Sequence, residues 1–361
     1  MKRVARSLFA LAIWPVLFLL GAPAGAQQDR LYVYNWNNYI TDETVARFEQ
    51  QCRCRLVQDY YADNEELLAK LAAGATGYDV LVPSANTVET LIRQGALRPI
   101  DKSLLPHLAN IKPEFLDGWF DPGNRYSVPY AYSVTLIGYN EQKLRELGVP
   151  TDTWAAIFEP KFLSRMRGKV TVLDSQRELM AAALIYLGDS ANETDPRKWR
   201  QARDLILRAK PYWAAFNASS YIKELTIGNI WLAHGYSNDM FTAQQDALRA
   251  RRKFTIAFSI PKEGAVFGLD NLVLHKTGRR PDLAHRFIDF LLEGESSATL
   301  TNAIGAGSPN AAAMRHIRAD IAANRAIFPG KEQLAGMQQL HDLDARQRRL
   351  LNRMWIEIKV R

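Results

Sequence analysis

The fold of this chain is decided by the stretch LYVYNWNNYI, residues 31–40. Its first half alternates apolar and aromatic residues, which is the composition of a buried strand. Its second half changes to Trp36, Asn37, Asn38 and Tyr39. Open α/β sheets bind their ligands beyond the carboxyl ends of their strands. The stretch therefore predicts either a strand that leads into a ligand loop, or a first strand whose large rings pack over the core.

Helices and strands alternate in the chain that follows. The elements predicted from apolar spacing, cap residues and glycines cover residues 44–51, 55–60, 64–71, 78–83 and 87–94. This βαβαβ rhythm predicts a doubly wound sheet with right-handed crossovers. The strand over 78–83 ends in polar residues that begin with Ser84, so we expect Ser84 and Asn38 at the same rim of the sheet.

The middle of the sequence predicts a second lobe. A long extended run over residues 126–140 can cross between two lobes, and residues 255–261 are expected to form a second crossing strand. A further strand is predicted over 228–235. No low-complexity linker separates these parts, which favours two lobes joined by crossing strands. The expected divisions are a signal peptide over 1–26, the first part of lobe 1 over 27–135, the main part of lobe 2 over 136–257, a return to lobe 1 over 258–300, and C-terminal helices over 301–361 that pack mainly on lobe 2.

Composition and charge are those of an exported globular protein. Of the 361 residues, 47% are hydrophobic and 23% are charged, as in an ordinary folded chain. Lys2 and Arg3 precede an apolar run, and the small residues 24–26 follow it, which together are typical of a cleaved signal peptide. The formal net charge is +8, but the basic runs lack the aromatic interleaving of a nucleic-acid surface. We therefore expect export and no binding of nucleic acid.

The two cysteines, Cys52 and Cys54, are separated by a single residue. A disulfide at this spacing closes a very small ring and would be strained. Two ligands do not complete a zinc site, and no His or second Cys pair is nearby in the sequence. We expect ordinary thiols at the edge of a strand, with a labile disulfide as the alternative.

Motifs of the common enzyme classes are absent from the sequence. It contains no G-x-S-x-G, no H-E-x-x-H, no P-loop and no G-x-G-x-x-G. His234 lies in an apolar run, as a buried structural histidine does. We expect neither an enzyme nor a bound metal or cofactor. An exported hydrolase is the alternative, although no pair of nucleophile and base is recognisable.

Three acidic residues stand apart from the scattered surface charges. Glu178, Asp239 and Asp270 each lie beside a predicted strand end or helix start. Each alone is typical of solvated surface, but together at the rims of two lobes, with Trp36 and Tyr39, they would form a cleft of rings and carboxylates. Such a cleft suits an organic cation, because carboxylates neutralise ammonium groups and rings attract them from their faces.

Four segments resemble the periplasmic putrescine/spermidine-binding proteins, which are the substrate-binding components of polyamine ABC importers. These segments are Tyr34–Trp36, Asp79–Ser84, Ile137–Asn140 and Phe258–Ala265. The resemblance extends from about Leu31 to the C-terminus. It implies an α/β fold of the two-lobed, type II-like periplasmic binding protein, in which each lobe is a mixed sheet flanked by helices and hinge strands cross between them. It also implies a periplasmic monomer that binds a polyamine and delivers it to a permease in the inner membrane.

The resemblance also assigns a ligand site. Its members are Trp36, Asn37, Asn38, Tyr39, Ser84, Glu178, Tyr236, Asp239 and Asp270. Four positions depart from the family pattern. Asn38 stands where an Asp is usual, Tyr236 where a Trp is usual, and Gly268 and Ala306 at aromatic positions. These changes keep two alternatives open: a binder of the same fold for another small solute, such as an amino acid or another amine, and a sensor that presents its ligand instead of transporting it.

Overall fold

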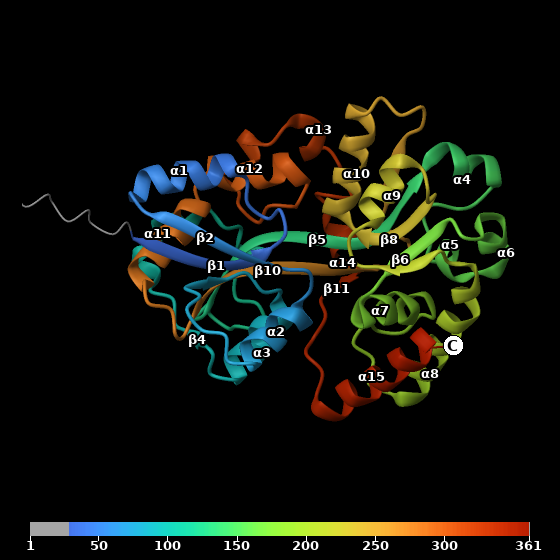
Figure 1. Ribbon diagram of the computed structural model, residues 1–361, viewed down its shortest axis with the longest axis horizontal. Coiled ribbons are helices and arrows are strands. Elements are labelled where there is room, and N and C mark those ends of the chain that lie inside the picture. Colours follow the sequence, from blue (N-terminus) through green and yellow to red (C-terminus); the bar gives the residue numbers. More distant parts are fainter. Residues whose placement is uncertain (1–28, 361) are drawn as a thin grey trace, which may run out of the picture.

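The computed structural model describes residues 29–360, so the expected signal peptide over 1–26 lies outside the described residues. Two α/β lobes stand side by side, and in each lobe helices lie on both faces of the sheet (Figure 1). Strands β5 and β10 run through both lobes and form the crossing connection (Figure 1). None of the helices within residues 29–360 is long and apolar enough to cross a membrane.

The strands form one continuous mixed sheet. They are β1 (Arg30–Trp36), β2 (Arg55–Tyr61), β3 (Val80–Leu81), β4 (Leu97–Arg98), β5 (Ser127–Asn140), β6 (Val170–Leu173), β7 (Ala215–Asn217), β8 (Leu232–Tyr236), β9 (Ile256–Ser259), β10 (Ala265–His275) and β11 (Met337–Gln338). The main order is β2-β1-β3-β10-β5-β8-β6-β7. Within it, β2, β1 and β3 are parallel, as the alternating pattern predicts, whereas β10 is antiparallel to both β3 and β5. The carboxyl ends of β1 and β3 therefore meet at one rim.

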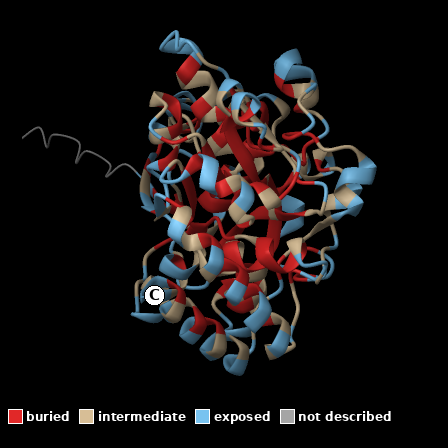
Figure 2. Cartoon of the chain, turned by 90° about the vertical axis from the view of Figure 1, so that its right-hand side faces the viewer, coloured by how far each residue is buried: buried red, intermediate tan, exposed pale blue. Residues whose placement is uncertain are grey.

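Helices of lobe 1 include α1 (Asp42–Cys52), α2 (Asn64–Ala72), α3 (Ala85–Arg93), α11 (Pro281–Leu291) and α12 (Gly294–Ile304). The remaining helices are α4 (Glu141–Leu147), α5 (Ala155–Phe158), α6 (Pro160–Leu163), α7 (Gln176–Tyr186), α8 (Pro196–Ala209), α9 (Tyr221–Ile227), α10 (Ser237–Arg249), α13 (Ala319–Ala322), α14 (Lys331–Ala335) and α15 (Ala345–Val360). Their apolar faces pack on the sheet, and buried residues follow the strands through the middle of the molecule (Figure 2). In lobe 1 the rings of Phe48 and Phe287 join α1 to α11, with centroids 4.9 Å apart. In lobe 2 Trp154 and Trp199 are the largest fully buried side chains.

Two expected strands differ from the structure. The segment 255–261 does not cross between lobes, because β9 pairs only with the end of β5 in lobe 2. The second crossing strand is instead β10, which bonds to β3 and β4 in lobe 1 and to β5 along its length. The strand expected from Gly228 begins only at Leu232. Gly228 has φ +81° and ends α9 in the left-handed conformation that glycine favours, so the chain turns there before it extends.

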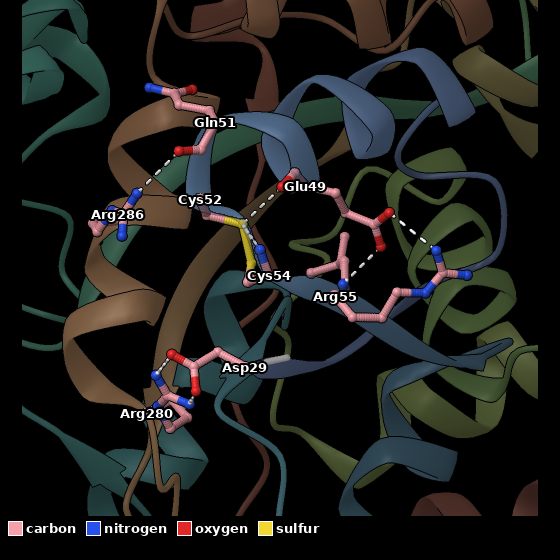
Figure 3. Close-up of a disulfide and its surroundings, with 9 residues drawn as sticks. Asp29, Glu49, Gln51, Cys52, Cys54, Arg55, Arg280 and Arg286 are labelled. Atoms are coloured by element: carbon pink, nitrogen blue, oxygen red, sulfur yellow. Dashed lines mark hydrogen bonds and ion pairs between the residues drawn. A yellow bond between two sulfur atoms is a disulfide. The ribbon is translucent and has the colours of Figure 1, made fainter. Parts of the chain in front are cut away.

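The expectation of free thiols is wrong, because Cys52 and Cys54 form a disulfide (Figure 3). Arg53 between them adopts the left-handed conformation, with φ 55°, and its N–H bonds to Glu49 O as the C-cap of α1. This tight reversal at the junction of α1 and β2 brings the two sulfur atoms to the same side. Glu49 closes the turn from the other side, since its carboxylate accepts hydrogen bonds from Leu56 N and from the Arg55 guanidinium.

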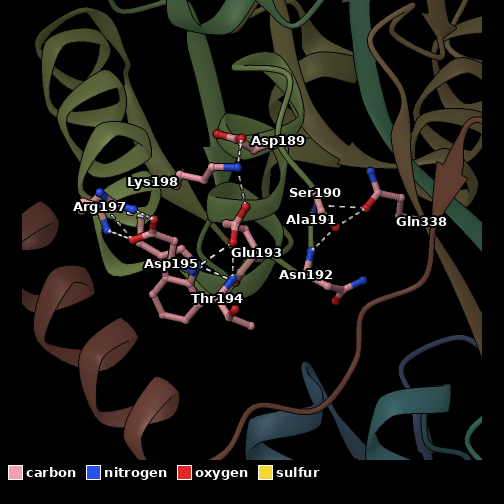
Figure 4. Close-up of polar contacts among 11 residues, drawn as sticks. Asp189, Ser190, Ala191, Asn192, Glu193, Thr194, Asp195, Arg197, Lys198 and Gln338 are labelled. Atoms are coloured by element: carbon pink, nitrogen blue, oxygen red, sulfur yellow. Dashed lines mark hydrogen bonds and ion pairs between the residues drawn. The ribbon is translucent and has the colours of Figure 1, made fainter.

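Residues 336–344, which we call the C-terminal strap, connect the two lobes a further time. Met337 pairs with Ala265 of β10. Gln338 Oε1 accepts hydrogen bonds of 2.9 Å from Ser190 Oγ and Ala191 N, both in lobe 2 (Figure 4). At the lobe 1 end of the strap, Asp342 accepts from Thr90 Oγ1 of α3 at 2.7 Å and contacts the guanidinium of Arg93. The strap then leads into α15 at the edge of lobe 2 (Figure 1).

Candidate ligand-binding cleft

A cavity of about 190 Å³ lies where the two lobes meet. Its walls come from the end of β1, the N-cap residue of α3, the middle of β5 and β10, and the starts of α7 and α10. All of the site residues expected from the sequence line it, namely Trp36, Asn37, Asn38, Tyr39, Ser84, Glu178, Tyr236, Asp239 and Asp270. Residues far apart in the sequence are thus brought to one place by the crossing of the strands.

Asp270 is the acidic group of the lobe 1 wall. It lies in the middle of β10, at an irregularity in the pairing with β5, and is only 6% exposed. Its two carboxylate oxygens accept hydrogen bonds of 2.6 Å from Ser84 Oγ and 2.7 Å from Tyr39 Oη. Burial raises the pKa of Asp270 to about 6, although both of these hydrogen bonds act in the opposite direction. Ser84 is fixed in turn by Asn64, whose Nδ2 lies 3.2 Å from Ser84 Oγ.

The aromatic side chains beside Asp270 are locked by hydrogen bonds to the end of β3. Trp36 Nε1 and Tyr61 Oη both donate to Val82 O, at 2.8 Å and 2.5 Å. The rings of Trp36 and Tyr61 lie 4.6 Å apart, and Tyr39 follows at 6.4 Å from Trp36. Tyr39 and Tyr61 are buried, so Trp36, which is half-buried, offers the largest ring surface to the cavity on this side.

Asn37 and Asn38 form the exposed edge of the cleft after β1. Asn38 has φ 59°, in the left-handed region where Asn is among the few side chains found regularly. The backbone thus reverses at Asn38 and returns Tyr39 toward Asp270. This backbone role is one physical reason for Asn at a position where the family resemblance expects Asp.

Asp239 and Glu178 are the acidic groups of the lobe 2 wall, and each lies in the first turn of a helix. Asp239 accepts hydrogen bonds from the Tyr221 hydroxyl and from Asn238 Nδ2. Glu178 accepts a 2.8 Å hydrogen bond from Thr135 Oγ1 of β5. Both side chains are half-buried, and helix N-termini favour negative charge.

Burial also raises the pKa values of these two acids. The pKa of Asp239 rises to about 6, against the hydrogen bond from Tyr221. The pKa of Glu178 rises to about 7, because burial outweighs the hydrogen bond from Thr135 and the positive charge of Arg177. Burial therefore disfavours the charged form of all three acids, and it does so most strongly for Glu178.

Tyr236 lies at the end of β8, between the acids of both walls. Burial raises its phenol pKa well above the ordinary value, and the charges of Glu178, Glu65, Asp239 and Asp270 raise it further. The phenol therefore stays neutral, and the half-buried ring forms part of the same cavity wall as Trp36.

The remaining departures from the family pattern have different outcomes. Gly268 lines the cavity, and a Cβ added there would meet Ser133 only at ordinary contact distance, so its small size leaves space open. Ala306 is fully buried and is not part of the cavity wall.

His234 is confirmed as a core residue: it is fully buried against Trp154, and burial lowers its pKa to about 3.

Several wall residues were missed in the sequence. They are Tyr61, Ala62, Asn64, Ser133, Thr135, Ala218, Ser219, Ile222 and Asn238. For Ser133 and Thr135 a signal exists, because residues two apart in a strand point to the same face. Tyr221, which holds Asp239, carries no such signal, since it comes from α9 and meets Asp239 only through the packing of α9 on α10.

A larger hollow on lobe 1 is a poorer candidate for a site. It measures about 610 Å³ and surrounds Asp79 and Arg280. Its two central charged groups already have partners: Arg280 pairs with Asp29, and Asp79 accepts from the backbone N–H groups of Tyr32, Arg279 and Arg280. Within residues 29–360, no group of three or more His, Cys, Asp or Glu side chains is arranged to hold a metal ion.

Two lobes around an acidic and aromatic cleft define a solute-binding protein. The sequence matches the family model for bacterial extracellular solute-binding proteins over residues 43–329, and the chain belongs to this family. It is 54% identical over 343 residues to the putrescine/cadaverine-binding protein of Pseudomonas aeruginosa, covering 95% of this chain and 97% of that protein. It is 34% identical over 341 residues to the putrescine-binding periplasmic protein PotF of Escherichia coli, covering 92% of each.

Solved structures share the fold. The structure of a putative spermidine/putrescine ABC transporter protein from Listeria monocytogenes superimposes with a TM-score of 0.84 at 28% identity, covering 92% of this chain and 99% of that one. The TpPotD lipoprotein Tp0655 of Treponema pallidum superimposes with a TM-score of 0.79 at 29% identity, covering 92% and 100%. The two-lobed fold expected from the sequence is thereby confirmed.

Proposed function

We propose that this chain is a periplasmic polyamine-binding protein that holds a small linear diamine between its lobes and delivers it to an ABC permease. One observation carries the proposal: the cavity walls contain three carboxylates and no Lys, Arg or His side chain. Three acids with raised pKa values have no cation of the protein within these walls to neutralise them. A ligand with two ammonium groups is the natural counter-charge.

The residues take distinct parts in this proposal. Asp270 binds one ammonium group together with Asp239, and Glu178 binds the other. Trp36 and Tyr236 cover the methylene chain and attract the cationic ends through their ring faces. Asn37, Asn38 and Ser84 supply polar contacts at the rim, and Tyr39 positions Asp270 through its hydroxyl. Closure of the lobes would remove water from the cleft and strengthen these contacts.

The names of the relatives support the same class of ligand. The Pseudomonas relative at 54% identity is named for putrescine and cadaverine, and the Escherichia coli relative for putrescine. The proposal includes a monomer that acts in the periplasm after loss of residues 1–26, binds no nucleic acid and performs no catalysis. It divides the chain as expected from the sequence, with lobe 1 over 27–135 and 258–300, lobe 2 over 136–257, and C-terminal helices over 301–361 that pack mainly on lobe 2. The one change is that β9 stays with lobe 2 to its end at Ser259.

Calorimetric titration tests the proposal. Putrescine, cadaverine, agmatine, spermidine and spermine are each titrated into the protein after any ligand retained from the host has been removed by partial unfolding and refolding. We expect saturable binding of the diamines with one site per chain. An absence of binding by all five amines, in protein whose melting shows that it is folded, would contradict the proposal.

A further inference from the structure

A second, smaller cavity of about 70 Å³ adjoins the cleft. The two cavities share wall residues, namely Trp36, Asn64, Ser84, Glu178, Tyr236 and Gly268. The two cavities therefore meet at Glu178 and Tyr236. From there the second cavity continues toward Gln339 and Leu340 of the C-terminal strap. A ligand longer than the cleft would extend into this space.

The charges of the second cavity differ from those of the cleft. Its walls contain Asp63, Glu65 and Glu178, but they also contain the guanidinium-bearing side chain of Arg177. Burial lowers the pKa of Arg177, and the negative charges of Glu178, Glu65 and Asp342 oppose this effect. An arginine remains protonated under such conditions. The acids beyond the cleft thus already have a cation of the protein among them.

Arg177 is held in this place by the strap. Its Nη2 donates a 3.0 Å hydrogen bond to His341 O. The His341 ring lies against Trp119 of lobe 1, with centroids 3.9 Å apart, and the next residue, Asp342, bonds to Thr90 of α3. The guanidinium is therefore tied to a segment that contacts both lobes, which opposes its displacement by a ligand.

We propose that Arg177 sets the length of the ligand, because its guanidinium takes the place that the third ammonium group of a longer polyamine would occupy. This inference rests on the proposed function and deepens it. A diamine ends at Glu178 and meets no positive charge, whereas a linear triamine extends past Glu178 and brings an ammonium group against Arg177. Like charges brought together in a binding site weaken the complex strongly. The protein thus selects diamines by supplying the third cation itself.

The test compares putrescine and spermidine in calorimetric titrations of three proteins: the wild type, Arg177→Gln and Arg177→Lys. We expect the wild type to prefer putrescine. In Arg177→Gln, the ratio of spermidine affinity to putrescine affinity should rise by about tenfold or more, since Glu65 becomes free to bind the third ammonium group. In Arg177→Lys the positive charge remains, so most of the wild-type preference should remain.

Arg93→Gln is the matched control for the strap. Arg93 also contacts Asp342, but it is not part of the wall of either cavity, so its loss should leave the ratio unchanged. An unchanged ratio in Arg177→Gln, or an equal rise in Arg177→Lys and Arg93→Gln, would overturn the inference. A wild type that binds spermidine as tightly as putrescine would overturn it without any variant. A wild type that binds neither amine would instead refute the proposed function, and the inference with it.

Discussion

The two walls of the cleft hold their carboxylates in different ways. On lobe 1, Asp270 is almost fully buried and is bonded by two hydroxyl groups, from Tyr39 and Ser84, that are themselves packed in place. On lobe 2, Asp239 and Glu178 are half-buried and lie in the first turn of a helix. Each accepts from one hydroxyl group, and Asp239 also accepts from Asn238 Nδ2. Lobe 1 thus provides a fixed anchor, and lobe 2 provides charges that remain closer to solvent.

This difference predicts where binding energy is concentrated. A fixed and dehydrated carboxylate loses the least on binding an ammonium group, because it has little water left to give up and no rotamers left to restrict. The half-buried acids still have water to lose when the ligand arrives. We therefore expect the lobe 1 acid to dominate affinity, and the lobe 2 acids to contribute less and to depend more on pH and on ligand length.

The largest effect is expected for Asp270→Asn. The amide keeps the shape but removes the charge, and its NH₂ group would face a hydroxyl that now donates to the carboxylate. Loss of one partner of a buried charge pair predicts a weakening of putrescine binding by about 3–5 kcal/mol. The matched control is Asp246→Asn, on the surface of α10, where only an ion pair with Arg249 is lost. Equal, small effects of both changes in calorimetry would refute the role of Asp270.

A smaller effect is expected for the acids of lobe 2, and the two should differ. Asp239→Asn should weaken putrescine binding by about 2–3 kcal/mol, as for a less buried charge pair. Glu178→Gln should cost only about 1 kcal/mol at pH 7. Its pKa of about 7 means that about half of the side chains are already protonated there before an ammonium group binds. If Glu178→Gln weakens putrescine binding as much as Asp270→Asn under the same conditions, the proposed difference between the lobes is wrong.

The third effect is on stability without ligand, and it depends on pH. The folded-state pKa values of about 6 and about 7 for Asp270 and Glu178 exceed ordinary values near 4, so between pH 4 and 7 the native state binds more protons than the unfolded state. The contribution of these two groups to the free energy of unfolding therefore falls as pH rises through this window. Glu178→Gln and Asp270→Asn should raise the melting temperature of the ligand-free protein at pH 8 and change it little at pH 5. Differential scanning fluorimetry at both pH values checks this, and a stabilisation that is equal at pH 5 and pH 8 would contradict it.

The smallest effect is expected at Gly268, which lies beside both walls. A Cβ there would stand 3.6 Å from Ser133 Oγ, an ordinary contact. Gly268→Ala should therefore change the free energy of unfolding by less than about 0.5 kcal/mol. Because the added methyl group takes space in the cleft, cadaverine should lose severalfold more affinity than putrescine. A strong drop in melting temperature would show that the space beside Gly268 is not open.

The sequence predicted Asp270 and its hydrogen-bond partners better than it predicted the partners of Asp239 and Glu178. Ser84, Tyr39 and Asp270 come from strand ends or strand interiors, where the rule for ligand sites in α/β sheets applies directly. Thr135 and Tyr221 determine how the lobe 2 acids are held, but they act through strand register and helix packing, which are set only when the whole chain folds. The crossing strand was misplaced because the segment 255–261 holds a higher share of strand-favouring residues than β10, whereas the pairing that makes β10 cross is set by the whole sheet.

The central claim is that the cleft holds three acids with raised pKa values that a cationic ligand neutralises. Proton release on binding tests this claim most directly. Putrescine is titrated calorimetrically at pH 6.5 in buffers of different ionisation enthalpy, and again at pH 8.5. Its amines are fully protonated at pH 6.5, so the ligand should displace protons from the acids with pKa values of about 6 to 7. We predict release of on the order of one proton per ligand at pH 6.5, and less at pH 8.5. Binding heats that do not depend on the buffer, or proton uptake at pH 6.5, would contradict the account.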